Sequence, residues 1–287
     1  MQFTLYQMEF MQGGHMNDDF MHLTSMQNPR VKQVVKLRER RDREKSDQFI
    51  IEGYRELLRA VDAKRVIDSL FICPELFLGV NEAALINTIK TRGTPVFSCT
   101  QSVFQKLSYR DRPDGLVAIA RQIHPTLDSL SKKTKDPELY IVAEAIEKPG
   151  NLGTILRSSD AAGVDGLILC DRCTDIHNPN VVRASVGTLF TVPVVEASGE
   201  ETFHWLKQKG IAILAATPQA DKLYTEVDMT VPLAIVVGTE QLGLTYLWMN
   251  QADIQVRIPM LGTANSLNVA TATTLLLYEA VRQRLQK

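Results

Sequence analysis

The sequence predicts a protein of two α/β domains, the second of which is built on a parallel sheet. Apolar strands alternate with helical segments along most of the chain, and a polar stretch with two prolines, residues 124–138, interrupts this alternation. The strands after this stretch are almost continuously apolar, as in parallel sheets covered on both faces. We expect a disordered leader over 1–24, a small domain over 25–123, the linker, and a larger domain over 139–287.

The elements follow from runs of apolar residues and from helical periodicity. In the first domain we expect strands over 49–53, 69–73, 95–99 and 115–121, with helices over 54–63, 82–93 and 101–108. In the second domain we expect strands over 139–145, 166–170, 192–196, 211–217, 233–238 and 252–260. Helices are expected from Asn151 to about 162 and over 179–190, 201–210 and 266–287.

The composition indicates a globular protein of a reducing compartment. The chain has 287 residues, of which 45% are hydrophobic and 23% charged, and no apolar run is long enough to cross a membrane. Four cysteines do not form a disulfide framework, which favours the cytoplasm. Cys170 and Cys173 have the spacing of a redox motif or half a zinc site, but no second pair completes four ligands, so we expect no metal.

The charge is distributed unevenly along the chain. The net charge of −1 combines +3 over residues 1–138 with −4 over residues 139–287. The segment Arg30–Lys45 carries eight basic and three acidic residues. Such a run is either a solvated helix face or a surface that contacts phosphates, and the sequence leaves both interpretations open.

Three of the loops that follow the strands of the second domain are unusual. The first, PGNLGTILRSSDAAG, predicts a helix capped by Asn151 and ended by Gly163, with Arg157 off its apolar face. The second, VVGTEQLGLT, places Glu240 between two glycines. The third, IPMLGTANSLNVA, precedes a helix capped by Ser266 or Asn265, with Asn268 in the first turn. Ligands of parallel sheets bind beyond the carboxyl ends of the strands, so these loops predict a pocket there.

The pocket does not have the motif of a dinucleotide site or a P-loop. The three loop sequences instead resemble, in order and spacing, the signature motifs of the SpoU/TrmH family of RNA 2′-O-ribose methyltransferases, within the SPOUT class. Residues 46–121 are similar to the family's small ribosomal-protein-like substrate-binding domain. The resemblance implies S-adenosylmethionine as cofactor, a C-terminal trefoil knot and a homodimer with the active site near the subunit interface.

The resemblance also implies roles for individual residues. The catalytic set would be Asn151, Arg157, Glu240, Ser266 and Asn268. The cofactor would lie against Thr217, Gly238, Ile258, Met260 and Leu267. Since an arginine stays protonated, we expect Arg157 to hold a phosphate beside the target ribose and to stabilise developing negative charge, with His177 as a spare base candidate on a polar surface.

RNA would contact the first domain through Arg30, Lys32, Arg41, Arg110 and Arg112, with Tyr109 beside the last two. Ribosomal RNA is the preferred partner, and transfer RNA stays open. Two other functions remain: a catalytically silent RNA-binding or assembly factor, and a SPOUT enzyme that methylates a base.

Overall fold

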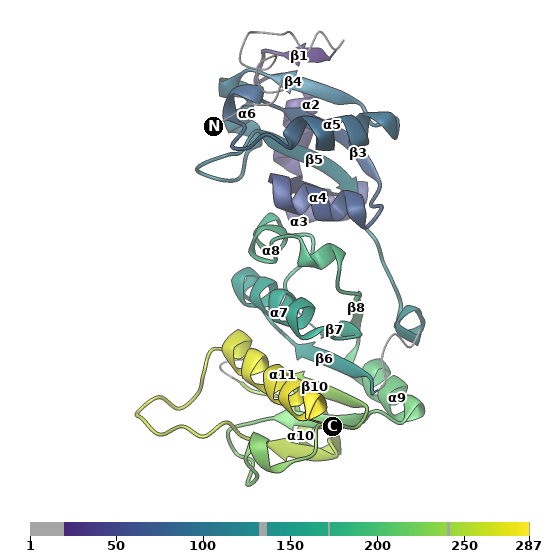
Figure 1. Cartoon of the computed structure of the whole chain (residues 1–287), viewed down its shortest axis with the longest axis vertical. Coiled ribbons are helices and arrows are strands. Elements are labelled where there is room, and N and C mark those ends of the chain that lie inside the picture. Colours follow the sequence, from purple (N-terminus) through teal and green to yellow (C-terminus); the bar gives the residue numbers. More distant parts are fainter. Residues whose placement is uncertain (1–19, 132–136, 172, 240–241, 287) are drawn as a thin grey trace. The chain divides into compact units, whose positions relative to one another are not determined.

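A computed structural model describes residues 20–131, 137–171, 173–239 and 242–286. The chain divides into two compact units, Met1–Gln122 and Ile123–Lys287 (Figure 1). Among the described residues, no helix has the length and apolarity needed to cross a bilayer.

The first unit contains a mixed five-stranded sheet in the order β1-β4-β3-β5-β2. Its strands are β1 (Met21–Leu23), β2 (Gln48–Glu52), β3 (Ile67–Ile72), β4 (Val96–Cys99) and β5 (Leu116–Arg121). Its helices are α2 (Pro29–Lys36), α3 (Arg40–Ser46), α4 (Tyr54–Asp62), α5 (Glu82–Thr91) and α6 (Gln101–Leu107), with a 3-10 turn η1 (Pro74–Leu76). Strand β5 runs antiparallel to both of its neighbours, β2 and β3.

Three elements of this unit, β1, α2 and α3, lie in segments for which the sequence predicted no strand or helix boundaries. Strand β1 pairs in parallel with β4 and lies inside the expected leader, whose residues 1–19 are outside the described part of the chain. The basic run forms α2 and α3, in which Val31 and Val34 are buried. Most of its charged residues are exposed, but Arg43 is buried and donates to the carbonyl oxygen of Leu37 at 2.9 Å.

The second unit contains a six-stranded sheet in the order β11-β9-β10-β6-β7-β8, parallel throughout, as predicted. Its strands are β6 (Leu139–Glu144), β7 (Gly166–Cys170), β8 (Val194–Ala197), β9 (Ala212–Ala216), β10 (Leu233–Val237) and β11 (Ile254–Val256). Its helices are α7 (Pro149–Ala162), α8 (Pro179–Ala184), α9 (Gly199–Lys209), α10 (Tyr246–Gln251) and α11 (Val269–Leu285), with 3-10 turns η2 (Leu127–Ser131), η3 (Thr188–Phe190) and η4 (Tyr224–Glu226).

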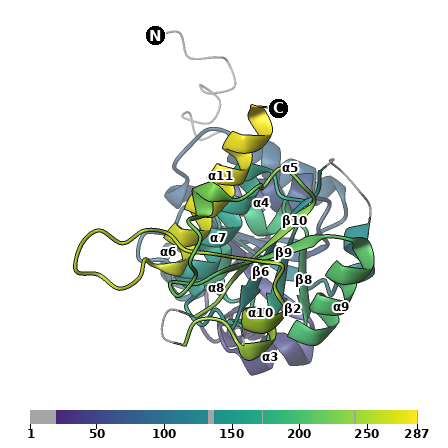
Figure 2. The ribbon, with the colours of Figure 1, turned by 90° about the horizontal axis from the view of Figure 1, so that it is seen from below.

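The helices of this unit cover both faces of its sheet. Figure 2 shows α7 and α11 on one side of the strands and α9 on the other. On the α9 side, Trp205 and Trp248 pack into one apolar cluster with Tyr140. On the opposite side, α7 and α11 contact each other, and the hydroxyls of Ser158 and Thr274 lie 2.6 Å apart.

The chain order of the strands reverses at β6, which has β7 on one side and β10 on the other. The chain leaves β6 toward β7 and β8 and later returns to pair β10 with the opposite edge of β6. A doubly wound sheet opens a crevice at such a point, at the carboxyl ends of the two strands. The trefoil knot implied by the resemblance stays a prediction.

Three predicted helix boundaries were wrong. Helix α7 starts at Pro149, with Lys148 rather than Asn151 at its N-cap, because a proline suits the first helical position. The predicted helix 179–190 is two pieces, since Val186 and Gly187 have φ angles of 52° and 81°. Helix α11 is capped by Asn268, neither Ser266 nor Asn265. The predicted stop at Gly163 was confirmed, with φ 66°.

Candidate functional site

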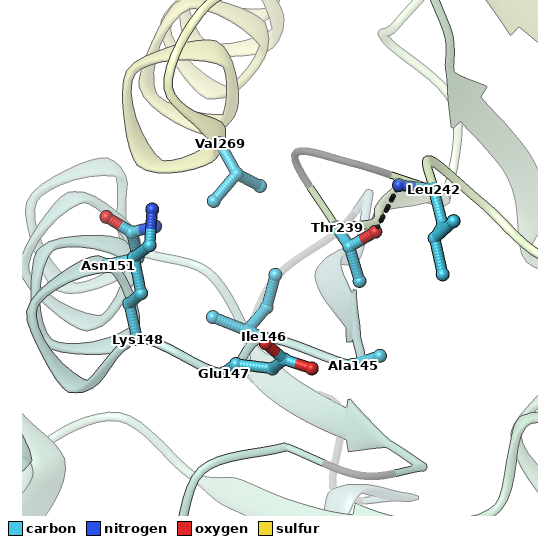
Figure 3. A pocket seen from close by; sticks show the side chains of 8 residues that line it. All are labelled: Ala145, Ile146, Glu147, Lys148, Asn151, Thr239, Leu242 and Val269. Atoms are coloured by element: carbon cyan, nitrogen blue, oxygen red, sulfur yellow. Dashed lines mark hydrogen bonds between the residues drawn. The ribbon is translucent and has the colours of Figure 1, made fainter.

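A pocket lies at the carboxyl ends of β6 and β10, where the order of the strands reverses (Figure 3). Its lining residues come from the loop after β6, the loop after β10 and the start of helices α7 and α11: Ala145, Ile146, Glu147, Lys148, Asn151, Thr239, Leu242 and Val269. Its volume is about 110 Å³, whereas sites for whole cofactors commonly measure roughly 300–1,000 Å³. The pocket formed by the described residues is therefore smaller than a site for a whole cofactor.

Asn151 and Asn268 join the first and third loops at this pocket. The side-chain amide of Asn268 donates to Oδ1 of Asn151 at 3.0 Å. The other end of the same amide, Oδ1, accepts from the backbone N–H of Ala270 at 3.1 Å and so caps α11. A residue that caps a helix has a fixed side-chain orientation, so α11 holds the amide of Asn151 in place.

A buried carboxylate joins the first loop to the second. Glu144, the last residue of β6, is 1% exposed. It accepts from the backbone N–H of Thr245 at 2.8 Å and from the hydroxyl of Thr245 at 2.7 Å. Thr245 ends the loop after β10, so this contact ties that loop to the end of β6; Figure 3 shows Thr239 and Leu242 across the pocket from Asn151. We did not select Glu144 from the sequence, although an acidic residue in so apolar a strand was a visible signal.

Gly238 makes the second loop possible by close packing of the backbone. A Cβ atom at this position would lie 2.4 Å from the carbonyl oxygen of Gly243, across the turn. Thr239 and Gly243 exchange backbone hydrogen bonds at 3.2 and 3.1 Å, and the hydroxyl of Thr239 accepts from the N–H of Leu242 at 2.9 Å. The glycine is required by the loop itself, whatever it does for a ligand. Glu240, expected in the catalytic set, lies outside the described residues.

The third loop, residues 257–268, extends away from the sheet between β11 and α11 (Figures 1 and 2). Ser266 is exposed, and Leu261 is 97% exposed. Ile258, Met260 and Leu267 are half-buried but do not line the pocket. Of the expected cofactor and catalytic residues of this loop, only Asn268 reaches the pocket, through its hydrogen bond to the lining residue Asn151.

The remaining predicted residues of this unit lie apart from the pocket lining. Arg157 is exposed on α7, where within the described residues its guanidinium makes no hydrogen bond or ion pair. Thr217 is buried just after β9, and its N–H donates to the carbonyl oxygen of Val256 at 2.9 Å. His177 is 5% exposed, so the expectation of a polar surface position was wrong.

Cys170 and Cys173 have a structural role. The sulfur of Cys173 accepts from the N–H of Ile146 and donates to the carbonyl oxygen of Ala143, both at 3.3 Å. Burial raises the pKa of Cys173 to about 11 and that of Cys170 to about 12, so both thiols stay protonated at neutral pH. Across the described part of the chain, no group of three or more possible metal ligands occurs.

The basic residues expected to bind RNA differ in their surroundings. Lys32, Arg41 and Arg112 are exposed. Arg30 is exposed too, and its guanidinium lies 4.4 Å from the centre of the Phe97 ring.

Arg110 is held inside the first unit by acidic groups. It lies 2.6 Å from a carboxylate oxygen of Glu56 and donates to the carbonyl oxygen of Glu52 at 2.7 Å. Burial raises the pKa of Glu56, although Arg110 opposes that rise. Arg110 therefore fixes the loop that presents Tyr109 and Arg112, and its own contact with RNA stays a prediction.

Comparisons with known proteins give one family match in each of the two units. Residues 138–278 match the SpoU rRNA Methylase family, and residues 28–118 match the MRM3-like substrate binding domain. The chain is 31% identical over 252 residues to the 23S rRNA (uridine(2479)-2'-O)-methyltransferase of Streptomyces viridochromogenes. The matched stretch covers 86% of each protein.

Solved structures extend the similarity to the fold of almost the whole chain. A crystal structure of an RNA 2′-O ribose methyltransferase is 39% identical, with a TM-score of 0.81 over 92% of this chain and 100% of the other. An AdoMet-bound rRNA methyltransferase from Sinorhizobium meliloti is 30% identical, with a TM-score of 0.84 over 92% of this chain and 98% of the other. The chain belongs to the SpoU/TrmH family of RNA methyltransferases.

Proposed function

We infer that the chain transfers a methyl group from S-adenosylmethionine to a ribose 2′-hydroxyl of ribosomal RNA. The observation that carries this inference is the hydrogen bond between Asn151 and Asn268, which joins two of the family's motifs at the crevice of the sheet. The relatives named above as rRNA or ribose 2′-O-methyltransferases are similar over most of the chain. This similarity also disfavours the alternative of a transfer RNA enzyme or a silent assembly factor.

The residues around the pocket suit S-adenosylmethionine. Ala145, Ile146, Leu242 and Val269 offer an apolar wall for a flat adenine ring, and the tight turn at Gly238 keeps side chains out of that wall. Ile258, Met260 and Leu267 would complete the site from the third loop, and Thr217 from the strand end beside it. We expect this loop to fold toward the pocket when the cofactor binds, because about 110 Å³ is too small for the whole molecule.

Bound S-adenosylmethionine supplies an already activated methyl group, so the protein has mainly to align the acceptor. We assign this task to Arg157, whose planar guanidinium can hold an RNA phosphate at two points and face the developing charge on the ribose oxygen. The proton of the hydroxyl passes to that phosphate or to water. Asn151, held by Asn268, orients the ribose, together with Ser266 and Glu240.

A homodimer would place a second copy beside this site. Helix α11 exposes Leu275 and Tyr278, which are 38% and 47% exposed, next to the helix that carries Arg157. Sedimentation equilibrium tests this: we expect a dimer for the wild-type chain and a monomer for Leu275→Glu with Tyr278→Glu. Leu285→Glu, at an 82% exposed position at the end of the same helix, serves as the control and should stay dimeric.

We place this enzyme with its RNA in the cytoplasm, where its four free thiols are stable.

The methyl transfer itself is tested with labelled S-adenosylmethionine and deproteinised 23S rRNA, followed by digestion and nucleoside analysis. We expect label in 2′-O-methyl nucleosides. Label in methylated bases, or label in transfer RNA but not in 23S rRNA, would overturn the proposal, as would the absence of any transfer.

A further inference from the structure

The first unit has a basic cavity at the edge of its sheet where β3 begins. Its volume is about 480 Å³, within the size range of ligand sites. It is lined by three basic residues, Lys64, Arg65 and Arg92, and by Val66, Ile67, Ile89 and Thr94. No acidic residue is among them. We call this cavity, defined by its three basic residues, the cationic pocket.

Lys64 occupies a backbone position that favours glycine. Its φ angle is 56°, just after the end of α4. The N–H of Lys64 donates to the carbonyl oxygen of Val61 at 3.0 Å, and that of Arg65 to the carbonyl oxygen of Ala60 at 2.9 Å. A left-handed residue after a helix is usually glycine, since a side chain there costs about 1 kcal/mol. Strained positions of this kind cluster where a side chain has a function.

The two arginines of the cationic pocket are positioned by the same turn. Nη1 of Arg92 donates to the carbonyl oxygen of Val61 at 3.0 Å, which uses one of the five N–H donors of its guanidinium. Burial lowers the pKa of Arg65, which means that its charge is costly in this position. The nearest acidic residue in the following strand, Asp68, lies 2.8 Å from Arg121 and is committed to that ion pair.

A structural arginine elsewhere in the chain has a different environment. Arg284, in α11, donates to the backbone carbonyl oxygens of Met229, Pro137, Glu138 and Val231 at 2.7 to 3.0 Å. Its burial also lowers its pKa, but carbonyl oxygens surround it. The cationic pocket differs in that three basic side chains, Lys64, Arg65 and Arg92, line one cavity.

We propose that the cationic pocket binds a phosphate group of the RNA substrate, with Lys64, Arg65 and Arg92 as ligands. Arginine clusters are suited to phosphate because a guanidinium matches two of its oxygens. Val66, Ile67 and Ile89 provide an apolar wall for the attached ribose. The site deepens the proposed function, on which it rests, by giving the substrate-binding domain an RNA contact separate from the loop of Tyr109 and Arg112.

The test compares RNA binding by full-length variants without S-adenosylmethionine. Lys64→Gly removes the charge at a position where glycine relieves strain, so the unfolding free energy should not decrease. Arg65→Gln removes the second charge. Lys209→Ala, which removes an exposed lysine from the last turn of α9, is the matched control. Binding of deproteinised 23S rRNA is measured by filter retention over a range of salt concentrations.

We expect each cationic-pocket variant to bind roughly two- to fivefold more weakly at low salt. The slope of log K against log salt should fall by about 0.7 to 0.9 for each phosphate that the variant no longer neutralises. The control should match the wild type. Equal behaviour of all four proteins would overturn the proposal.

A free phosphate compound is the other source of the same chemistry. AMP and pyrophosphate are therefore titrated calorimetrically into the wild type and Lys64→Gly. Binding of either compound that is lost in Lys64→Gly, with RNA binding unchanged, would overturn the assignment to RNA. Because these measurements involve no methyl transfer, they are independent of a failure of the proposed reaction.

Discussion

The loops that follow β6 and β10 are joined by hydrogen bonds to the buried carboxylate of Glu144, whereas most residues of the loop that follows β11 are exposed. The first region, which we call the fixed wall, comprises residues 144–151, 238, 239 and 242–245, joined through Glu144 and Thr245. The second, the open wall, comprises residues 257–268, with Leu261 almost fully exposed. We propose that the fixed wall is the preorganised part of the cofactor site and that the open wall completes the site when the cofactor binds.

The largest expected effect concerns Arg157, which is carried by a helix of the fixed wall but is exposed to solvent. We expect Arg157→Ala to lower single-turnover methyl transfer by about a hundredfold or more, the usual loss when one preorganised charged donor is removed. Arg157→Lys should recover little, because lysine cannot hold a phosphate at two points. The measurement uses saturating cofactor and RNA.

The control for Arg157 is Thr154→Ala, at an exposed position of the same helix, where the hydroxyl donates to the carbonyl oxygen of Gly150. Its rate should stay within about threefold of the wild type, which is less than 1 kcal/mol of barrier. If Arg157→Ala also stays within that limit, Arg157 is a surface residue and the proposed mechanism fails.

Gly238 in the fixed wall and Gly262 in the open wall differ in the space around a side chain. A Cβ at Gly238 would lie 2.4 Å from the carbonyl oxygen of Gly243, whereas a Cβ at Gly262 would have no atom within 4 Å. We expect Gly238→Val to lower the unfolding free energy by about 1–3 kcal/mol, as overpacking does, and to weaken cofactor binding. Gly262→Val should change the unfolding free energy by less than about 0.5 kcal/mol. Urea unfolding and calorimetry measure both, and equal destabilisation would contradict the distinction between the walls.

A smaller effect is expected from the carboxylate that joins the two loops of the fixed wall. Glu144→Gln keeps the shape of the side chain but exchanges charged hydrogen bonds to Thr245 for neutral ones, which should cost about 1 kcal/mol of unfolding free energy. Glu147→Gln, three residues away and exposed, should cost less than about 0.3 kcal/mol. Urea unfolding of the two variants gives the difference, and similar values would show that Glu144 does not hold the loops.

The sequence predicted the parts of the molecule that depend on strand composition. Continuous apolar runs predicted that the second sheet is parallel, and the rule for parallel sheets predicted a pocket at the carboxyl ends of its strands. Asn151 was selected for the wrong local reason, since Pro149 starts α7 and leaves the Asn151 side chain for Asn268. A side chain that could cap a helix can instead form a hydrogen bond with a residue far away in the sequence, which a local sequence pattern does not reveal.

Other features depend on contacts between residues far apart in sequence. Glu144 and Thr245 are separated by 101 positions, so no local pattern pairs them. The burial of His177 and Arg43 was missed for the same reason. The cationic pocket was missed because Lys64 and Arg92 follow the ends of two different helices. The positive φ angle of Lys64 was missed because the sequence has no glycine at this position to indicate it.

The last comparison of the walls uses the reactivity of single thiols, one of which, Cys173, accepts a hydrogen bond from Ile146 of the fixed wall. Burial raises the pKa of Cys173 to about 11, so at pH 8 about one thiol in a thousand is ionised, against roughly a quarter for an ordinary cysteine. We expect its alkylation by iodoacetamide to be about a hundredfold slower in the folded chain than in urea. The rate should rise about tenfold per pH unit toward pH 11, because only the thiolate reacts, and should hardly respond to S-adenosylmethionine.

A cysteine introduced in the open wall should behave in the opposite way. At the 97% exposed position 261, Leu261→Cys should react at the rate of a free thiol without cofactor, since nothing buries it. If the loop folds over the bound cofactor, saturating S-adenosylmethionine should slow this reaction by at least about tenfold, while Cys173 in the same molecule serves as the internal control. Mass spectrometry of the alkylated peptides measures both rates at once. Equal protection of the two thiols would indicate a change of the whole unit, and protection of neither would mean that the open wall takes no part in the cofactor site.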